Sequence, residues 1–276
     1  MPTPSPVAAP WRDAFVSHIE DMAEPSFVLS SLHPSAPSSA PETNILPRAR
    51  TVIFRGMWSS LPVNPKNPAE LNPVGAYETD LPTITTDARM EKIPELFHSA
   101  AAGEQGEGAK EGPQTRRGGP VEAVFWMPKA RTQWRLRGHT YIIGPDVDSH
   151  AAAPVRAALA KYMRRRGHDE AGPWSWSREL TAHFGNLSPL MRGTFRNPPP
   201  GTPVSETPGK GVRLAMGQKV EDVEDEVARR NFRVIIVVPE EVDQVDLTDP
   251  ERARRWNYSL AEEEGVASWK VTELWP

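Results

Sequence analysis

The sequence predicts a mainly β protein, an antiparallel β-barrel with helical insertions. Three observations lead to this fold class. Short segments rich in Val, Ile, Phe and Trp recur along the 276 residues at hairpin-scale spacing. The 30 prolines cluster between these segments, and proline marks breaks between elements because it cannot donate to a β-ladder. The chain has no glycine-rich strand-to-helix turn of the dinucleotide-binding type, so a doubly wound parallel sheet is not expected.

The first half of the chain should open with an amphipathic helix. Trp11, Phe15, Ile19 and Met22 recur at helical spacing, and Pro25 ends the pattern. The strands that follow in this half are expected at residues 26–32, 50–57, 80–86, 121–128 and 132–144. A helix over 87–97 should continue directly from the third of these strands.

The second half starts with a helical block. Helices are expected over 150–167 and 175–185, before a turn-like segment at 188–195 and an exposed helix or linker at 220–230. The closing strands are expected at residues 231–238, 242–247, 254–260 and 267–274. We expect one domain over residues 1–276, with mobile loops where the sequence is rich in proline, glycine or charge, at 33–44, 62–78, 99–120 and 197–230.

Composition argues against several functions. A net charge of −4 makes bulk attraction to nucleic acid unexpected, and no apolar run is long enough to predict a membrane span. The absence of cysteine excludes disulfides, thiolate chemistry and Cys-ligated zinc. The seven histidines lack metal-site spacing, so no metal is expected. No basic flank precedes an apolar stretch at the N-terminus, and a cytoplasmic location is the expectation.

Basic residues flank a short apolar strand in "PRARTVIFRGM", residues 47–57. Side chains alternate along a strand, so Arg50 and Val52 should share one face while Thr51 and Arg55 share the other. Arginines at the two ends of a strand can simply reach water. They can also meet an anion, and the sequence of this strand alone leaves both interpretations open.

A second basic cluster lies in "TITTDARMEKI", residues 83–93. Thr86 or Asp87 is a natural N-cap, and the free amides of a helix start attract phosphate. Arg89 and Lys92 lie on one face of the first two turns, where cations oppose the helix dipole unless an anion is bound. The alternative is an ordinary solvated turn in which Asp87 and Glu91 offset the two cations.

Five motifs in order resemble the pyridoxamine 5′-phosphate oxidase-like flavoproteins: "PRARTVIFRG", "TTDARMEKIPEL", "FWMPKARTQWRLRG", "NFRVIIVVPEEVDQVDL" and "WKVTELWP". The Alr4036-type FMN-binding domain is the most similar branch, and its fungal members are especially similar. The resemblance runs from about residue 10 to residue 276. It implies an FMN-binding split β-barrel, a homodimer with FMN at the interface, and a flavin-dependent oxidoreductase acting on a small substrate. The alternatives are a non-catalytic flavin-binding module and a barrel that has lost the cofactor.

The resemblance also assigns roles within the first three motifs. The family's strand arginines match Arg50 and Arg55. Of the Ser-Arg-Lys that binds the phosphate in the family, only the lysine is present here, as Lys92. Arg89, at the neighbouring position, would supply the positive charge of the missing arginine. Its flavin-edge glutamine matches Gln133. The full set of candidate cofactor-binding residues is Arg50, Thr51, Val52, Arg55, Thr85, Thr86, Arg89, Lys92 and Gln133. Trp126 and Trp134 could wall the flavin or belong to the barrel core.

The substrate side is less well matched. True oxidases carry an Arg-x-His near the C-terminus, whereas this chain has "RRWNY" there, with Arg254 and Arg255 but no histidine. Arg192, in "SPLMRGTFRNPPPG", is a further candidate that could equally be a surface charge. No catalytic residue is identified, and strict oxidation of pyridoxamine 5′-phosphate is not expected.

Overall fold

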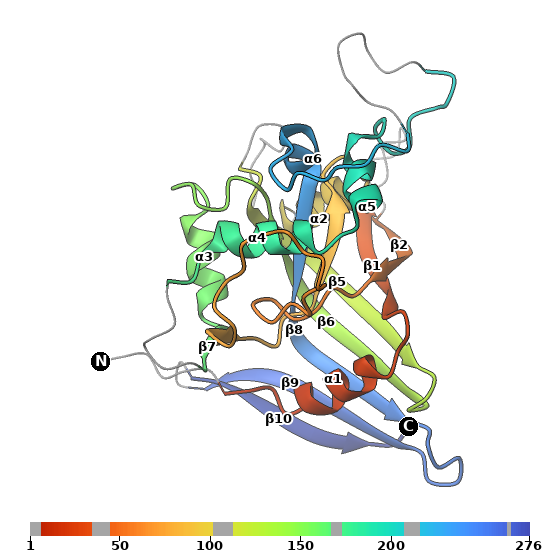
Figure 1. Ribbon diagram of the computed structural model, residues 1–276. Helices are drawn as coiled ribbons and strands as arrows, with labels where there is room; N and C mark the ends of the chain where they lie inside the picture. The colour runs from red at the N-terminus through yellow and green to blue at the C-terminus, as the bar shows by residue number, and fades with distance from the viewer. Residues whose placement is uncertain (1–6, 35–44, 102–112, 167–172, 207–215, 264–265) are drawn as a thin grey trace.

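The computed structural model describes residues 7–34, 45–101, 113–166, 173–206, 216–263 and 266–276, and strands dominate it (Figure 1). The strands are β1 (Ser26–Pro34), β2 (Ile45–Ile53), β3 (Tyr77–Glu78), β4 (Thr83–Asp87), β5 (Arg116–Met127), β6 (Thr132–Ile143), β7 (Arg164–Arg165), β8 (Phe232–Asp246), β9 (Arg254–Glu263) and β10 (Val266–Leu274). The helices are α1 (Arg12–Glu20), α2 (Lys92–Ala101), α3 (Ala153–Ala160), α4 (Trp176–Gly185), α5 (Pro189–Gly193), the 3-10 turn η1 (Thr194–Arg196) and α6 (Glu226–Asn231).

One eight-stranded antiparallel sheet forms the body of the protein. Its strand order is β10-β9-β8-β6-β5-β1-β2, and β4 pairs with the other end of β8. The mainly β class with helical insertions is confirmed. Within the described residues the sheet does not close into a barrel, because β2 and β10 stand at opposite ends of the strand order. β3 and β7 form a separate two-stranded ribbon.

β8 is the central strand and corrects one prediction. The expected strands at 231–238 and 242–247 are a single strand of 15 residues that runs through Pro239. Proline cannot donate to the ladder, and the register between β6 and β8 shifts between Arg137 and Gly138. Gly138 pairs with Pro239, and its lack of a side chain admits the close approach of the Val238 carbonyl group.

Two hydrophobic clusters lie against opposite faces of β8. Ile235 and Val237 face the first cluster, and Val234 and Ile236 face the second, all fully buried. Burial on both faces explains why this strand reads as a continuous apolar run. The first cluster includes α1, whose Phe15 packs edge-on against two aromatic rings of the sheet, whereas the second includes side chains of α3, α4 and α6.

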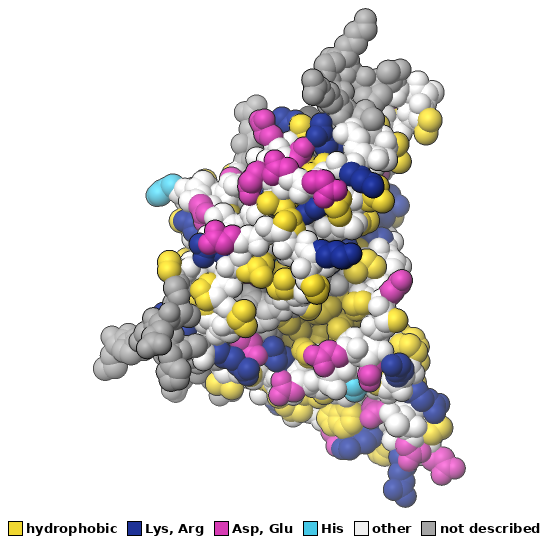
Figure 2. Space-filling view, viewed as in Figure 1, with side chains coloured by type: hydrophobic (Ala, Val, Ile, Leu, Met, Phe, Trp, Pro, Cys, Tyr) yellow, Lys and Arg dark blue, Asp and Glu magenta, His cyan; other side chains and the backbone are white. Residues whose placement is uncertain are grey.

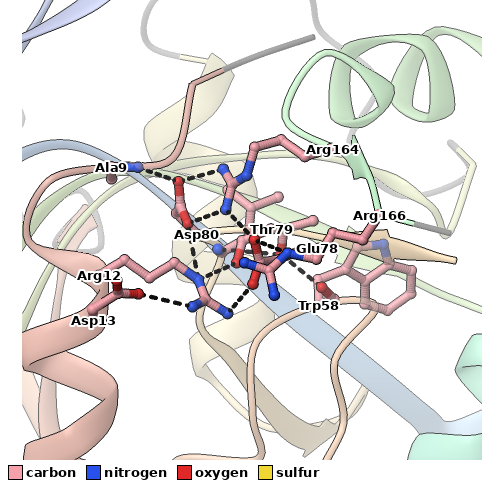
Figure 3. Close-up of polar contacts among 10 residues, drawn as sticks. Ala9, Arg12, Asp13, Trp58, Glu78, Thr79, Asp80, Arg164 and Arg166 are labelled. Atoms are coloured by element: carbon pink, nitrogen blue, oxygen red, sulfur yellow. Dashed lines mark hydrogen bonds and ion pairs between the residues drawn. The ribbon is translucent and has the colours of Figure 1, made fainter. Parts of the chain in front are cut away.

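An ion-pair network ties the N-terminal segment to the β3–β7 ribbon (Figure 3). Asp80 accepts the backbone N–H of Ala9 at 2.8 Å and pairs with Arg164. Arg12 of α1 pairs with both Glu78 and Asp80, at 2.9 and 3.2 Å. Because these charges are largely buried, each carboxylate depends on its arginines, and the network fixes where α1 enters the fold.

Two predicted helices begin or end elsewhere. The helix expected over 87–97 begins at Lys92, so the predicted N-cap at Thr86 or Asp87 is wrong. Asp87 instead closes a tight turn, since its Oδ1 accepts the backbone N–H of Arg89 at 2.8 Å. The helix expected over 150–167 is the shorter α3, after which the chain enters β7, and α5 lies within the segment expected to be turn-like.

The visible surface is mixed in charge. Figure 2 shows acidic and basic side chains interspersed across one face of the molecule. In the described part of the chain, no helix is both long enough and apolar enough to cross a membrane. The expected loops at 33–44, 99–120 and 197–230 fall partly outside the described residues.

Candidate cofactor site

Three elements converge on the guanidinium of Arg50. β2 supplies Arg50, β1 supplies Ser31 and α2 supplies Glu95. Arg50 forms an ion pair with the Glu95 carboxylate, and its Nη1 donates to the Ser31 hydroxyl at 2.6 Å. The same hydroxyl donates to Glu95 at 2.7 Å, so the three side chains form a closed set. The Glu95 side chain is 1% exposed and that of Arg50 is 22% exposed, so the arginine alone reaches the surface.

Lys92 stands beside this set, one helical turn before Glu95. Its Nζ donates to the Thr86 hydroxyl at 3.0 Å and approaches the Met90 sulfur at 2.9 Å. Among the described residues it makes no ion pair. Burial and then the nearby charge of Arg50 lower the pKa of Lys92. Lys92 is therefore a half-buried cation whose hydrogen-bond partners, within the described part of the chain, are a hydroxyl and a thioether.

The charges of this group suit a phosphate. Three cations, Arg50, Lys92 and Arg89, lie near two buried carboxylates: Glu95 pairs with Arg50, and Asp87, which also acts on Lys92, pairs with Arg89. One positive charge is left without a partner among the described residues, where burial makes an unpaired charge costly. A phosphate monoester, with oxygen acceptors and negative charge, would satisfy both Arg50 and Lys92.

Arg55 and Thr85 form a second group. Arg55 Nε donates to the Thr85 hydroxyl at 3.2 Å, and burial lowers the pKa of Arg55. Thr85 and Thr86 are consecutive in β4, so their side chains point to opposite faces. Thr86 meets Lys92, whereas Thr85 and Arg55 point toward the helical side, where Arg55 is close enough to affect His183.

Gln133 and Thr51 belong to a third group, on the outer face of the sheet. Arg50 is paired with Leu29 and lies on the face of the first hydrophobic cluster, together with half-buried Val52. Thr51 pairs with Val28 and points the other way. Gln133 pairs with Trp126, which is 49% exposed on that outer face, whereas Trp134 is fully buried core.

Within one subunit, the side chains of Gln133 and Arg50 are too far apart to contact the same part of a ligand. Gln133 lies on β6, which is three strands in from the edge strand β2. At the usual strand spacing this is about 14 Å, and the two side chains also lie on opposite faces of the sheet. The structure thus divides the candidate cofactor residues between two faces of one subunit.

The remaining candidate arginines have structural partners. Arg89 pairs with Asp87 and donates to the Asn197 and Phe195 carbonyl oxygens, at 2.9 and 3.2 Å. It therefore links the turn before α2 to η1 and to the residue that follows η1. Arg192 is 2% exposed and donates to the Val220 carbonyl oxygen at 2.8 Å, which makes it an interior residue of the helical side.

The two arginines of "RRWNY" lie on β9 and point to different partners. Arg255 pairs with Asp243 at 2.9 Å, and exposed Arg254 pairs with Glu273 at 2.9 Å. Strand alternation places them on opposite faces of β9. The structure does not bring them together with Arg192.

Sequence reasoning did not select Glu95 or Ser31. Glu95 carries a weak signal, since it follows Lys92 by three residues and therefore shares its helix face. Ser31 carries none, because its contact depends on β1 meeting α2 in the folded chain.

A comparison with known protein families matches the first half of the chain. Residues 8–144, just under half of the chain, match the family described as "Pyridoxamine 5′-phosphate oxidase, FMN-binding domain". The matched segment contains the Arg50–Lys92 group, the Arg55–Thr85 group and Gln133. No curated protein matches the chain significantly.

Two solved structures are similar to the chain. A pyridoxamine 5′-phosphate oxidase-related, FMN-binding protein from Nostoc punctiforme PCC 73102 is 20% identical, with a TM-score of 0.57 over 98% of this chain and 100% of that one. PhzG from Burkholderia lata 383, in complex with tetrahydrophenazine-1-carboxylic acid, is 12% identical over 99% of both chains, and its TM-score of 0.44 is too low to support an argument. Residues 8–144 are thus similar to the FMN-binding domain of the pyridoxamine 5′-phosphate oxidase type, the whole chain shares the fold of an FMN-binding protein, and FMN is the cofactor that these matches support.

Proposed function

We propose that the protein is an FMN-dependent oxidoreductase acting on a small substrate, with Arg50 and Lys92 as ligands of the FMN phosphate. The observation that carries the binding mode is the half-buried pair Arg50 and Lys92, of which only Arg50 makes an ion pair with a carboxylate among the described residues. Bound FMN supplies the hydride and electron-transfer chemistry, while the protein holds and orients the cofactor. Strict oxidation of pyridoxamine 5′-phosphate is not proposed, because the substrate arginines are separated and internally paired.

The binding mode can be tested by titrating apoprotein with FMN. Arg50→Ala and Lys92→Ala should each weaken FMN binding by tenfold or more, because a hydrogen bond to a charged group contributes about 1.5–3 kcal/mol. Lys270→Ala, which removes an exposed lysine of β10, is the matched control for charge. Equal FMN affinity in all three variants would overturn the assignment of the phosphate ligands.

We also propose that FMN lies between two copies of this chain. The supporting observation is the division of the cofactor residues between two faces of the sheet. A second copy whose outer face meets the edge strand β2 of the first would bring its Gln133 and Thr51 against the FMN held by Arg50 and Lys92 of the first. Val28, Ile53 and Trp126 share this face by register and are 39%, 39% and 49% exposed, which supplies apolar area for the contact.

The proposed dimer predicts linked effects on assembly and cofactor. Trp126→Glu should convert a dimer into a monomer in light scattering and should release flavin. Trp275→Glu, at a side chain that is 94% exposed beyond β10, should do neither. A Trp126→Glu variant that stays dimeric, or a monomeric wild type that binds FMN fully, would refute the interface.

Catalysis is separated from simple flavin binding by a redox test. We expect NAD(P)H to bleach the bound flavin without oxygen, and air to restore it. A protein that holds FMN but is not reduced by NAD(P)H or by candidate amines would favour the non-catalytic module. The cytoplasmic location stays a prediction from the sequence.

A further inference from the structure

We infer that Glu95 is a positioning residue for the cofactor phosphate, acting through Arg50 rather than touching the ligand. This inference rests on the proposed function of Arg50 and Lys92. The side chain of Glu95 is 1% exposed, and a carboxylate buried to this degree is costly to charge unless it is paired and hydrogen-bonded. Its partners are Arg50 and Ser31, whose side chains also contact each other.

The geometry limits the freedom of the arginine. A free arginine side chain samples many rotamers, and much of that conformational entropy is lost when the guanidinium binds an anion. In this fold Nη2 is held by Glu95, and Nη1 is held by Ser31 at 2.6 Å and by the Leu29 carbonyl oxygen at 3.5 Å. The cost of ordering the side chain is therefore met on folding, before any ligand arrives.

Glu95 also keeps two cations together. Burial lowers the pKa of Lys92 most, Arg50 lowers it further, and Glu95 and Asp87 raise it, so Glu95 acts on Lys92 as well as on Arg50. Without the carboxylate, Arg50 and Lys92 would repel each other across a half-buried space, and Arg50 could turn out to water from the edge strand β2. His33 of β1 is a further neighbour of the carboxylate, with its Nδ1 3.7 Å from Glu95 Oε1.

A second role is physically possible and predicts the opposite result. A carboxylate beside a phosphate repels it, so Glu95 could instead oppose FMN by competing for Arg50. Glu95→Gln separates the two roles, because the amide oxygen still accepts from Arg50 and from Ser31 but carries no charge. A competitor would be removed equally well by Gln and by Ala.

The test is FMN and riboflavin titration of apoprotein variants. If Glu95 positions Arg50, Glu95→Ala should weaken FMN binding about tenfold, and Glu95→Gln should restore it to within about threefold of wild type. Riboflavin lacks the phosphate, so its affinity should be the same in all of these variants. The ratio of FMN to riboflavin affinity thus reports the phosphate site and is insensitive to a general loss of structure.

A double-mutant cycle completes the design. Glu95→Ala should have no further effect on FMN affinity in an Arg50→Ala background, since the residue acts through that arginine. Glu251→Ala, which removes an exposed carboxylate in the β8–β9 turn, controls for net charge. Tighter FMN binding in both Glu95 variants, or additive losses in the cycle, would overturn the inference. A wild type that binds no FMN would instead refute the proposed function itself.

Discussion

His183 makes the folded protein sensitive to acid. Its ring stacks on Trp58, with centroids 5.6 Å apart, and both ring nitrogens are buried with no hydrogen-bond partner in the described residues. Burial, and to a smaller degree the charge of Arg55, lowers the pKa of His183 to about 3. An unfolded histidine has a pKa of about 6.5. As the pH falls below about 6.5, His183 therefore binds a proton in the unfolded state but not in the folded state. The free energy of unfolding decreases as a result, down to about pH 3.

The size of this effect follows from the two pKa values. Between pH 7 and pH 4.5 the His183 contribution should lower the free energy of unfolding by about 2.5 kcal/mol. Nearby Glu179 opposes this loss, because burial raises its pKa and the folded state then binds a proton first. A comparison of two variants is therefore needed to isolate the histidine.

His183→Phe provides that comparison, because a phenyl ring keeps the stack on Trp58 and removes both unpartnered nitrogens. Urea unfolding followed by circular dichroism at pH 7, 5.5 and 4.5 should show wild type losing about 2.5 kcal/mol relative to His183→Phe. His150→Phe, at an exposed position, should follow the wild-type profile. Parallel pH profiles for wild type and His183→Phe would refute the claim that this ring is buried and neutral.

Two further predictions concern residues around the proposed phosphate site. Burial and the charge of Arg50 lower the pKa of Lys92, so Lys92 should lose its charge at a pH where an ordinary lysine is still charged. FMN affinity should therefore fall as the pH rises in titrations between about pH 7 and 9.5. Lys92→Arg should flatten this dependence, because arginine stays charged over that range. Arg89→Ala should cost about 3 kcal/mol of unfolding free energy, because it leaves buried Asp87 unpaired, while changing FMN affinity much less than Lys92→Ala does. A large loss of FMN affinity in Arg89→Ala, without a loss of stability, would instead make Arg89 a phosphate ligand.

The strands were the most predictable part of the fold. Residues 121–128 and 132–144 carry clear apolar patterns and match β5 and β6, each prediction running one residue past the strand's C-terminal end and β5 starting earlier, at Arg116. β8 was divided in the prediction because Pro239 normally ends a strand, and only the matching irregularity at Gly138 of β6 allows it to continue. That compensation lies about 100 residues away in sequence and has no local signal.

The sequence supplied candidate residues for the site but not their arrangement. Alternation within β2 correctly separated Arg50 from Thr51, because it depends only on strand geometry. The sequence could not show that Gln133 would lie three strands from β2, on the other face, because that depends on strand order. It also could not show that Arg89 would be tied to the carbonyl oxygens of Asn197 and Phe195.

The central claim is that this chain holds FMN through Arg50 and Lys92. An absorbance scan from about 300 to 550 nm on purified wild type and on an Arg50→Ala, Lys92→Ala double variant, with any released chromophore identified by mass, tests it most directly. The account predicts flavin bands and released FMN from the wild type, and little or no flavin from the folded double variant. A wild type that neither carries FMN nor gains it on addition, or a double variant that holds FMN as tightly as wild type, would contradict the account.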